Sequence, residues 1–336
     1  MLKSYLIILT LLMFFIDLTA QSFDIPSSRW GISFGNSKEF TGLRFNFRER
    51  DVEKISGINV TFWKAYENNF SEVRGISFGL LPEAAYLYGL NLGLGGPAAE
   101  KELSGISIGI LGAGSGGDIS GIGIGGLGIG GGGSMSGIFL GGLGAGGGGD
   151  LTGVGIGGLG VGCGGSTKGF TVGLLGVGAG ENMTGINAGG LGAGAGKDVT
   201  GFTLGLLGVG AGQILTGVTL GGIGVGAGEA IYGITIGGIG VGSPKIRGIT
   251  IGGVAAGGVD IKGVTAALGM VIIEEDGKHT GFNLSAFNYI KGTQVGFSIG
   301  IVNYAHTLKG VQIGLVNYVR DNPKYLKVLP IINANF

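Results

Sequence analysis

Apolar residues alternate with glycine along most of the chain, in a unit that recurs at a fixed spacing. Unit starts lie sixteen residues apart from Ser104 to Tyr232, and two more units begin at Arg247 and Lys262, each after fifteen residues. A typical copy, from Thr152 to Thr167, reads TGVGIGGLGVGCGGST. A fixed period of this length is typical of proteins built from stacked repeats.

The alternation inside one copy predicts two short strands. Val154 and Ile156 are two residues apart, whereas Val161 and Cys163 repeat the spacing on the opposite parity. Successive side chains of a strand point to opposite faces. A turn at Gly157-Gly158 would therefore keep both sets on one side, and we expect aliphatic side chains inside and glycines outside.

A second, polar corner closes each unit. It carries the charges of the repeat region at corresponding positions, namely Asp118, Asp150, Glu181, Lys197, Asp198, Glu229 and Lys245. Looser copies follow the same pattern and begin at Thr41, Ser56, Arg74 and Tyr88 upstream and at Thr280, Val295 and Lys309 downstream. Terminal copies of this kind are typical caps of a repeat array.

These copies predict an all-β fold, an elongated parallel β-solenoid of about eighteen turns of 14–18 residues. One unit buries too few side chains to fold alone, but stacked copies pair their backbones and place each aliphatic residue on its equivalent. The expected organisation is a signal peptide over 1–20, looser repeats over 21–103, regular repeats over 104–272 and a C-terminal aromatic cap over 273–336.

An outer-membrane β-barrel is the alternative architecture. The chain ends in Phe336, with Val328, Ile332 and Ala334 on the same alternation, which resembles the last strand of bacterial outer-membrane barrels. Spanning strands need about 9–11 residues, and a sixteen-residue hairpin leaves fewer than that for each strand. Strand length therefore favours the solenoid.

Charge and the N-terminus set the expected location. Lys+Arg and Asp+Glu number 21 each and charged residues total 12%, so nothing indicates a nucleic-acid partner, and the surface should meet something other than bulk water. Lys3, an apolar run over 5–16 and Ala20 have the order of a secretory signal peptide. We expect an exported protein of the cell surface, the outer membrane or the extracellular space.

The sequence offers no catalytic, cofactor or metal site. Its two histidines, His279 and His306, lie in different terminal turns, and no His/Cys cluster has metal-binding spacing. Cys163 is the single cysteine, and a small side chain filling the core is the expected role. We therefore expect a protein that is not an enzyme.

Two polar rows stand out from the glycine background. The residue between the two apolar positions of the first strand predicts an outward ladder of Thr171, Asn187, Thr203, Thr219, Thr235, Thr250 and Thr265. Flat threonine arrays occur in ice-binding proteins, although a threonine also suits any exposed strand position. Asn288, Asn303 and Asn317, each followed by tyrosine, predict a structural ladder of stacked amides at a tight corner.

The units GFSIGIVNY and GVQIGLVNY, the IGGLGVGAG copies and the ending NPKYLKVLPIINANF resemble the leptospiral-type bacterial surface-repeat proteins. The resemblance covers most of the mature chain and implies an envelope location, without any activity to transfer. We expect a non-enzymatic surface or envelope protein with a structural or interaction role. Its partner would be the outer-membrane surface, a polysaccharide or another sheet; the alternatives are an integral outer-membrane barrel and an ice- or glycan-binding solenoid.

Overall fold

The computed structural model describes residues 22–336 except residue 67. The predicted signal peptide lies outside the described residues. The chain divides into two compact units, unit 1 ending at Gly141 and unit 2 beginning at Gly142, so the division falls inside the regular repeats.

The described part of unit 1 contains eleven strands. They are β1 (Ser22–Pro26), β2 (Trp30–Gly35), β3 (Glu39–Asn46), β4 (Lys54–Thr61), β5 (Glu72–Gly79), β6 (Glu83–Gly93), β7 (Ala98–Gly109), β8 (Gly112–Ser115), β9 (Asp118–Gly125), β10 (Gly128–Gly131) and β11 (Met135–Gly141).

Unit 2 consists of the remaining strands and one short 3₁₀ helix. In its regular part, long strands alternate with short ones: β12 (Gly144–Gly147), β13 (Leu151–Gly157), β14 (Gly160–Cys163), β15 (Thr167–Gly173), β16 (Gly176–Ala179), β17 (Met183–Gly189), β18 (Gly192–Ala195), β19 (Val199–Gly205), β20 (Gly208–Ala211), β21 (Ile214–Gly221), β22 (Gly224–Ala227), β23 (Ala230–Gly237), β24 (Gly240–Gly242) and β25 (Lys245–Gly252). The last turns contain β26 (Ala255–Ala267), β27 (Met270–Leu284), β28 (Phe287–Ile299), β29 (Val302–Val319), η2 (Lys324–Leu326) and β30 (Val328–Asn335).

Successive turns pair in parallel, which confirms the predicted solenoid. In unit 2, β13 pairs with β15 so that Gly153 lies beside Gly169, and β14 pairs with β16 in the same sixteen-residue register. The described chain contains about 17 turns. Neighbouring strands of a barrel of the outer-membrane class run antiparallel, so the barrel alternative does not describe this fold.

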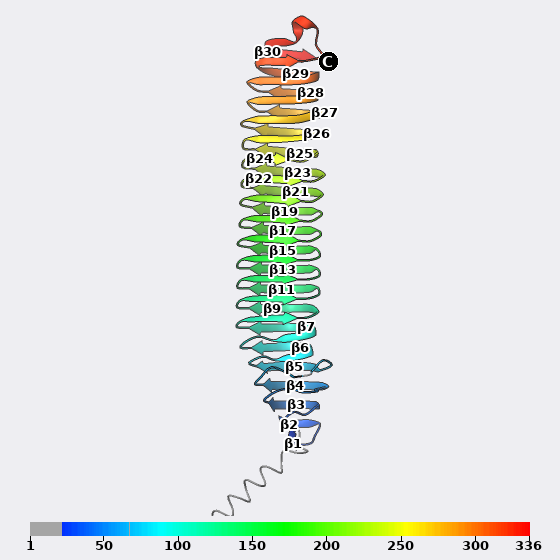
Figure 1. Cartoon of the computed structure of the whole chain (residues 1–336), viewed down its shortest axis with the longest axis vertical. Helices are drawn as coiled ribbons and strands as arrows, with labels where there is room; N and C mark the ends of the chain where they lie inside the picture. Colours follow the sequence, from blue (N-terminus) through cyan, green and yellow to red (C-terminus); the bar gives the residue numbers. More distant parts are fainter. Residues whose placement is uncertain (1–21, 67) are drawn as a thin grey trace, which may run out of the picture. The chain divides into compact units, whose positions relative to one another are not determined.

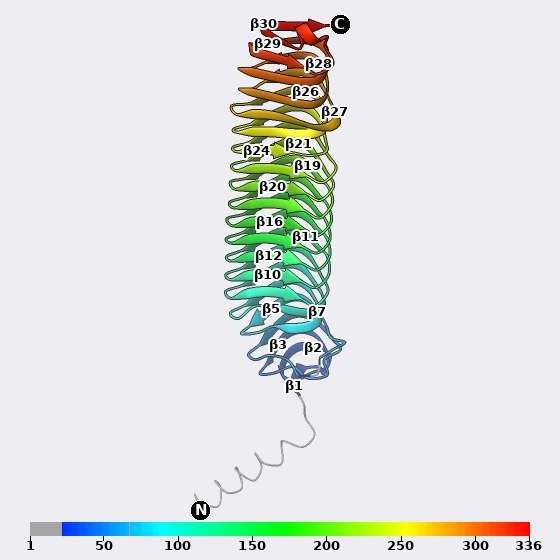
Figure 2. The ribbon, with the colours of Figure 1, turned by 45° about the horizontal axis from the view of Figure 1, so that its top comes forward.

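The regular part of unit 2 has two sheets. The long-strand sheet contains β13, β15, β17, β19, β21, β23 and β25, and the short-strand sheet contains β12 to β24 in even numbers. Figure 1 shows the strands of unit 2 lying one above the next, and Figure 2 shows both series of strands. From β26 onward, one strand covers both positions of a turn.

The aliphatic pair in the middle of each long strand, Val154 and Ile156 in β13, points outward, contrary to the prediction. In β13 the inward positions are Leu151, Gly155 and Gly157, whereas Ile156 is 39% exposed. The short strand β14 points Val161 inward, with 4% exposure. Odd-numbered positions therefore face inward both before and after the glycine corner. As a result, Val154 and Ile156 lie on the outer face of β13, whereas Val161 lies on the inner face of β14.

The narrow core explains this arrangement. A Cβ built on Gly155 would lie 2.9 Å from Cγ1 of Val161 and 3.4 Å from Cδ1 of Leu151. The inward valine and leucine already fill the space between the two sheets. At the Gly155 row the long-strand sheet consequently has room inside for glycine, threonine and asparagine, and the aliphatic residues on either side of this row lie on the outer face.

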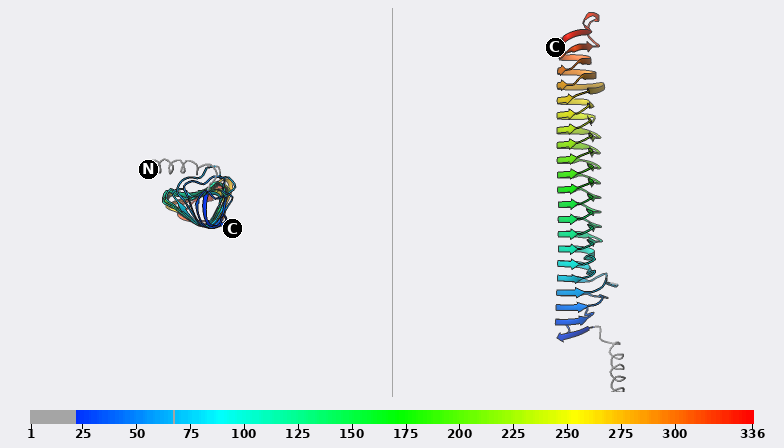
Figure 3. Two further views of the ribbon diagram at one scale, coloured as in Figure 1. Left: turned by 90° about the horizontal axis from the view of Figure 1, so that it is seen from below. Right: turned by 90° about the vertical axis from the view of Figure 1, so that its left-hand side faces the viewer.

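Antiparallel strands terminate both described ends. β1 pairs antiparallel with β2 in unit 1, and β30 pairs antiparallel with β29 in unit 2. Figure 3 shows the strands of each unit from the side, with these terminal strands at the ends of the series. An antiparallel strand covers the edge that a parallel stack would leave open, which limits edge-to-edge pairing.

Candidate functional site: an apolar sheet face and a polar pocket region

In unit 2, two rows of aliphatic and phenylalanine side chains lie on the outer surface of the long-strand sheet, and a third aliphatic row lies along the adjoining glycine corner. We call this surface the apolar face. The first row is Val154, Phe170, Ile186, Phe202, Val218, Ile234 and Ile249; the second is Ile156, Val172, Ala188, Leu204, Leu220, Ile236 and Ile251; the third, at the glycine corner, is Leu159, Leu175, Leu191, Leu207, Ile223, Ile239 and Val254.

The apolar face is larger than the apolar patches of ordinary soluble proteins. Its large side chains that count as exposed have between 37% and 54% of their surface in water. At roughly 80 Å² for each such side chain the face presents on the order of 1,200 Å², whereas the largest patch on a typical monomer is about 300–600 Å². Apolar surfaces of this size are uncommon on soluble monomers and are typical of surfaces that contact another molecule.

None of the three rows contains a charged residue. At the start of the long strands, one further outward row holds Lys168 and Arg247 among neutral residues. The remaining charges of the regular turns lie at the polar corner, where Lys197 Nζ is 3.1 Å from Glu181 Oε1. Charge is thus confined to one edge of the long-strand sheet.

The predicted outward threonine ladder lies inside unit 2, and this is the main correction to the sequence reading. Thr171, Asn187, Thr203, Thr219, Thr235, Thr250 and Thr265 are at most 1% exposed. They occupy the inward parity that the aliphatic residues were expected to fill. The Thr171 hydroxyl donates to Asn187 Oδ1 at 2.6 Å, while the Thr203 hydroxyl has no partner among the described residues. A buried row cannot contact ice, so the ice-binding alternative loses its basis.

The asparagine ladder lies at inward strand positions rather than at a corner. Asn288 Nδ2 donates to Asn303 Oδ1 at 2.7 Å, and Asn303 Nδ2 donates to Asn317 Oδ1 at 2.7 Å. None of the three has a positive φ, so left-handed backbone is not the reason for asparagine here. The stacked amides instead satisfy one another in a core of very low exposure.

The tyrosines that follow these asparagines form an outward stack. The ring centroids of Tyr289 and Tyr304 are 5.0 Å apart, and those of Tyr304 and Tyr318 are 5.2 Å apart. Tyr289 is tilted against Tyr304 and Tyr304 is stacked on Tyr318, and these ring contacts stabilise the C-terminal turns of unit 2.

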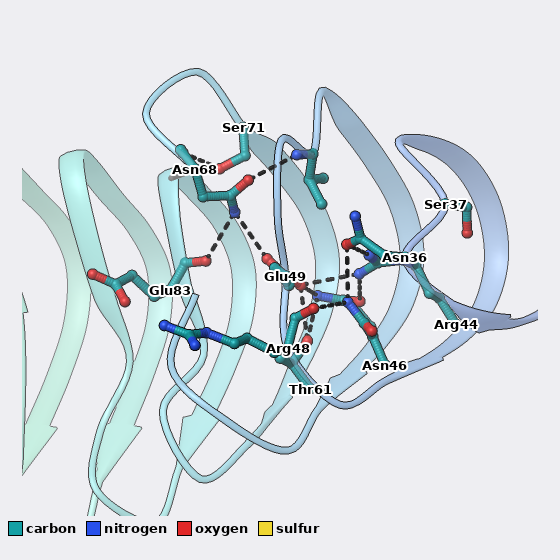
Figure 4. A network of polar contacts seen from close by, with 12 residues as sticks. Asn36, Ser37, Arg44, Asn46, Arg48, Glu49, Thr61, Asn68, Ser71 and Glu83 are labelled. Carbon is teal, nitrogen blue, oxygen red and sulfur yellow. Dashed lines mark hydrogen bonds and ion pairs between the residues drawn. The ribbon is translucent and has the colours of Figure 1, made fainter. Parts of the chain in front are cut away.

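A buried ion pair occupies the core of unit 1. Arg44, fully buried, donates from Nη1 to Glu49 Oε1 at 3.0 Å and to Asn59 Oδ1 at 2.8 Å (Figure 4). Glu49 also accepts from Thr61 Oγ1 at 2.8 Å and from Asn68 Nδ2 at 3.0 Å. Burial lowers the pKa of Arg44, and Glu49 opposes that effect. Sequence reasoning missed this network, although Arg44 stands at the inward position that threonine occupies later.

Three cavities surround this network on the surface of unit 1. An apolar groove of about 600 Å³ lies beside Phe47 and Phe62, whose stacked rings are 5.5 Å apart. A recess of about 590 Å³ is lined by Asn36, Arg48, Arg50 and Tyr66. A third cavity, of about 380 Å³, has both cations and carboxylates in its lining, including Arg48 and Glu83, and burial raises the pKa of Glu83.

The solitary reactive side chains do not assemble into a catalytic group. Buried His279 has a pKa lowered by desolvation to about 4, and its Nε2 lies 3.4 Å from Thr265 Oγ1. Cys163 is half-buried, and burial raises the pKa of its thiol. Within the described residues, no set of three or more His, Cys, Asp and Glu side chains is placed to hold a metal ion.

Comparisons with family models, curated proteins and solved structures give no match for this chain. Over the part of the chain that the structure describes, no helix has the length and apolar character needed to cross a membrane.

Proposed function

We propose that this chain is an exported, non-enzymatic repeat protein of the bacterial envelope or cell surface, with a structural role exerted through the apolar face of unit 2. We further propose that the partner of this face is the same face of a second copy. The observation that carries the proposal is the set of three charge-free apolar rows, two on the long-strand sheet and one along the adjoining glycine corner.

The area of the face supports pairing with another protein sheet. A stable protein–protein interface buries about 800 Å² on each partner, and the apolar face presents on the order of 1,200 Å². Two sheets that pack face to face lie about 10 Å apart, with interleaved side chains. Such a packing requires aliphatic side chains on both sheets, and isoleucine, leucine and valine make up most of the apolar face.

The backbone amide groups beneath the apolar face are already hydrogen-bonded, so an interface there could exclude water. Each long strand is paired in register with the strands above and below it in the regular turns, so its amide groups already have partners. Pairing would therefore bury side chains without leaving backbone groups unsatisfied, which would otherwise cost stability. Obligate dimer interfaces have this apolar character.

The test is the mass of the mature chain in solution, measured by sedimentation equilibrium at micromolar concentration. We expect twice the chain mass for the natural sequence and the single-chain mass for the double variant Ile234→Lys/Ile236→Lys, because both side chains lie on the face. Gln213→Lys adds a charge at the polar corner and should leave the dimer intact. A natural sequence that stays monomeric contradicts the pairing, as does a monomer that floats with lipid vesicles.

The location is tested separately by cell fractionation and surface proteolysis of an epitope-tagged chain. An exported envelope protein should be recovered with the envelope or become sensitive to protease added outside the cell. Recovery in the cytoplasm would contradict the location without affecting the pairing of the apolar face.

A further inference from the structure

We propose that unit 1 contains a binding site for an anionic membrane lipid, with one acyl chain in the apolar groove and the phosphate in the adjoining arginine recess. This site lies in unit 1 and does not depend on the pairing proposed for unit 2.

The groove has the properties of a site for an acyl chain. Its volume is about 600 Å³, within the range of small-molecule pockets. The lining is dominated by Phe45, Phe47, Phe62, Phe78 and Leu80. Phe47 and Phe62 are 66% and 61% exposed, so these rings stand at the surface without any cover from the described chain.

The polar side chains of the groove are engaged elsewhere. The hydroxyl of Thr61 donates to buried Glu49 at 2.8 Å. Asn46 Nδ2 donates to the carbonyl of Arg48 at 2.8 Å and to Asn36 Oδ1 at 3.1 Å. The Thr61 hydroxyl and the Asn46 amide nitrogen therefore already have partners inside unit 1 and do not compete with an apolar ligand for the groove.

The recess has the properties of a site for a phosphate group. Its lining contains two guanidinium groups and no carboxylate. The guanidinium of Arg48 lies 4.9 Å from the centroid of the Tyr66 ring, and that of Arg50 lies 5.5 Å from it. The Nε of Arg48 donates to the Lys64 carbonyl at 3.1 Å, while Arg48 forms no ion pair with any described residue. The Arg50–Asp51 contact is long, at 3.9 Å. Paired guanidinium donors match the geometry of a phosphate.

Groove and recess adjoin each other. Asn46 lines the groove and is hydrogen-bonded to Asn36, which lines the recess. Phe47 and Arg48 are consecutive in the chain and line one site each. Figure 4 shows Asn36, Asn46 and Arg48 in the same region around the buried network. An apolar slot that continues into a pair of cations fits the tail and head of one anionic amphiphile.

The experiment is calorimetric titration of the mature chain with alkyl phosphates of eight, ten and twelve carbons, each below its micelle concentration. Affinity should rise by up to about fourfold for each added methylene, and level off once the groove is filled. The titration is repeated in the Ile234→Lys/Ile236→Lys background, so that chains adsorbed on the apolar face of unit 2 are recognised separately.

Two pairs of variants separate the tail from the head. Phe62→Glu should weaken decyl phosphate binding by more than tenfold, whereas Phe70→Glu, at a ring that is 82% exposed and does not line the groove, should leave it unchanged. Arg48→Gln/Arg50→Gln should weaken decyl phosphate about tenfold and leave decanol binding unaltered. Circular dichroism checks that each variant keeps its fold.

Three results would overturn the proposal. One is the absence of decyl phosphate binding. Another is equal binding by Phe62→Glu and Phe70→Glu, which would place the chain elsewhere. The third is an unchanged affinity of the double arginine variant, which would remove the phosphate from the recess. Inorganic phosphate alone should bind too weakly to detect, and strong binding would assign the recess to a free anion instead.

Discussion

His279 makes the C-terminal turns of unit 2 sensitive to mild acid. The side chain is fully buried, its Nδ1 has no hydrogen-bond partner among the described residues, and desolvation lowers its pKa from 6.5 to about 4. Between these two values the opened chain binds a proton that the folded chain does not. The stabilisation that comes from keeping His279 neutral is therefore fully present above about pH 6.5 and is lost as the pH falls toward 4.

The size of the effect follows from the two pKa values. The free energy of opening should fall by about 2 kcal/mol between pH 7 and pH 5, and by about 3 kcal/mol once the pH is below both values. Repeat proteins open locally rather than all at once. Amide hydrogen exchange in β27 and β28 is thus a better measure than a single melting temperature, and the protection factors there should drop about 20-fold.

His279→Leu is the matched variant. Leucine suits this inward row, where the register partner of His279 in β26 is Ile261. Carboxylates also titrate near pH 5, so the difference between the natural chain and the variant isolates the histidine. The variant should lose most of the pH dependence in β27 and β28. Equal pH dependence in both chains would refute the assignment of the acid sensitivity to His279.

Three further outcomes follow from the core. Thr203→Val removes a buried hydroxyl that has no partner among the described residues, and should raise the urea midpoint by the equivalent of up to about 1 kcal/mol; a lower midpoint would show that the hydroxyl is bonded. Cys163 should react with iodoacetamide at least about tenfold more slowly at pH 7.5 in the folded than in the urea-unfolded chain, because burial raises its pKa; equal rates would contradict this. Gly217→Ala should destabilise by about 2 kcal/mol or more, since φ is 117° and the new Cβ would lie 2.2 Å from the Gly201 carbonyl oxygen. Gly210→Ala, with no atom within 4 Å of its Cβ, should stay within about 1 kcal/mol of the natural chain, and equal losses in both would refute the distinction.

The repeat period predicted the stacking correctly because period and register are the same quantity in a solenoid. Thr152 lies beside Lys168, and Tyr232 beside Arg247, as the sixteen- and fifteen-residue spacings require. The period contains no information about which face of a strand is inside, since alternation looks the same from either side. The inward assignment of Val154 therefore rested on apolarity alone.

A signal for the correct assignment was nevertheless present. Lys168 and Arg247 stand two residues before Phe170 and Ile249, on the same parity of their strands. An inward parity would have buried both charges in a core too narrow for ion pairs, whereas an outward parity leaves them at the edge of the sheet. A charged residue in a row therefore indicates which side of the strand faces outward more reliably than the aliphatic residues of the same row do.

The polar region of unit 1 could not be predicted in the same way. Arg44 and Glu49 belong to different segments of one turn, and their partner Asn68 comes from a later loop. Local sequence spacing does not indicate that these groups meet. The groove beside Phe62 depends on the same irregular loops, so only the coordinates bring it together with Arg48.

The glycines fall into two classes: some are required by the backbone conformation or by close packing, and others have free space around them. Gly217 needs its positive φ, and Gly157 has a carbonyl oxygen 2.0 Å from its Cβ position, so the fold requires both. Gly210, on the outer surface of a short strand, meets neither constraint. Because the short strands carry outward glycines at most regular turns, they present almost no side chains to a partner. The apolar surface that unit 2 offers through its regular turns therefore lies on the outward rows of the long strands and of the adjoining glycine corner, which is why the proposed pairing is placed there.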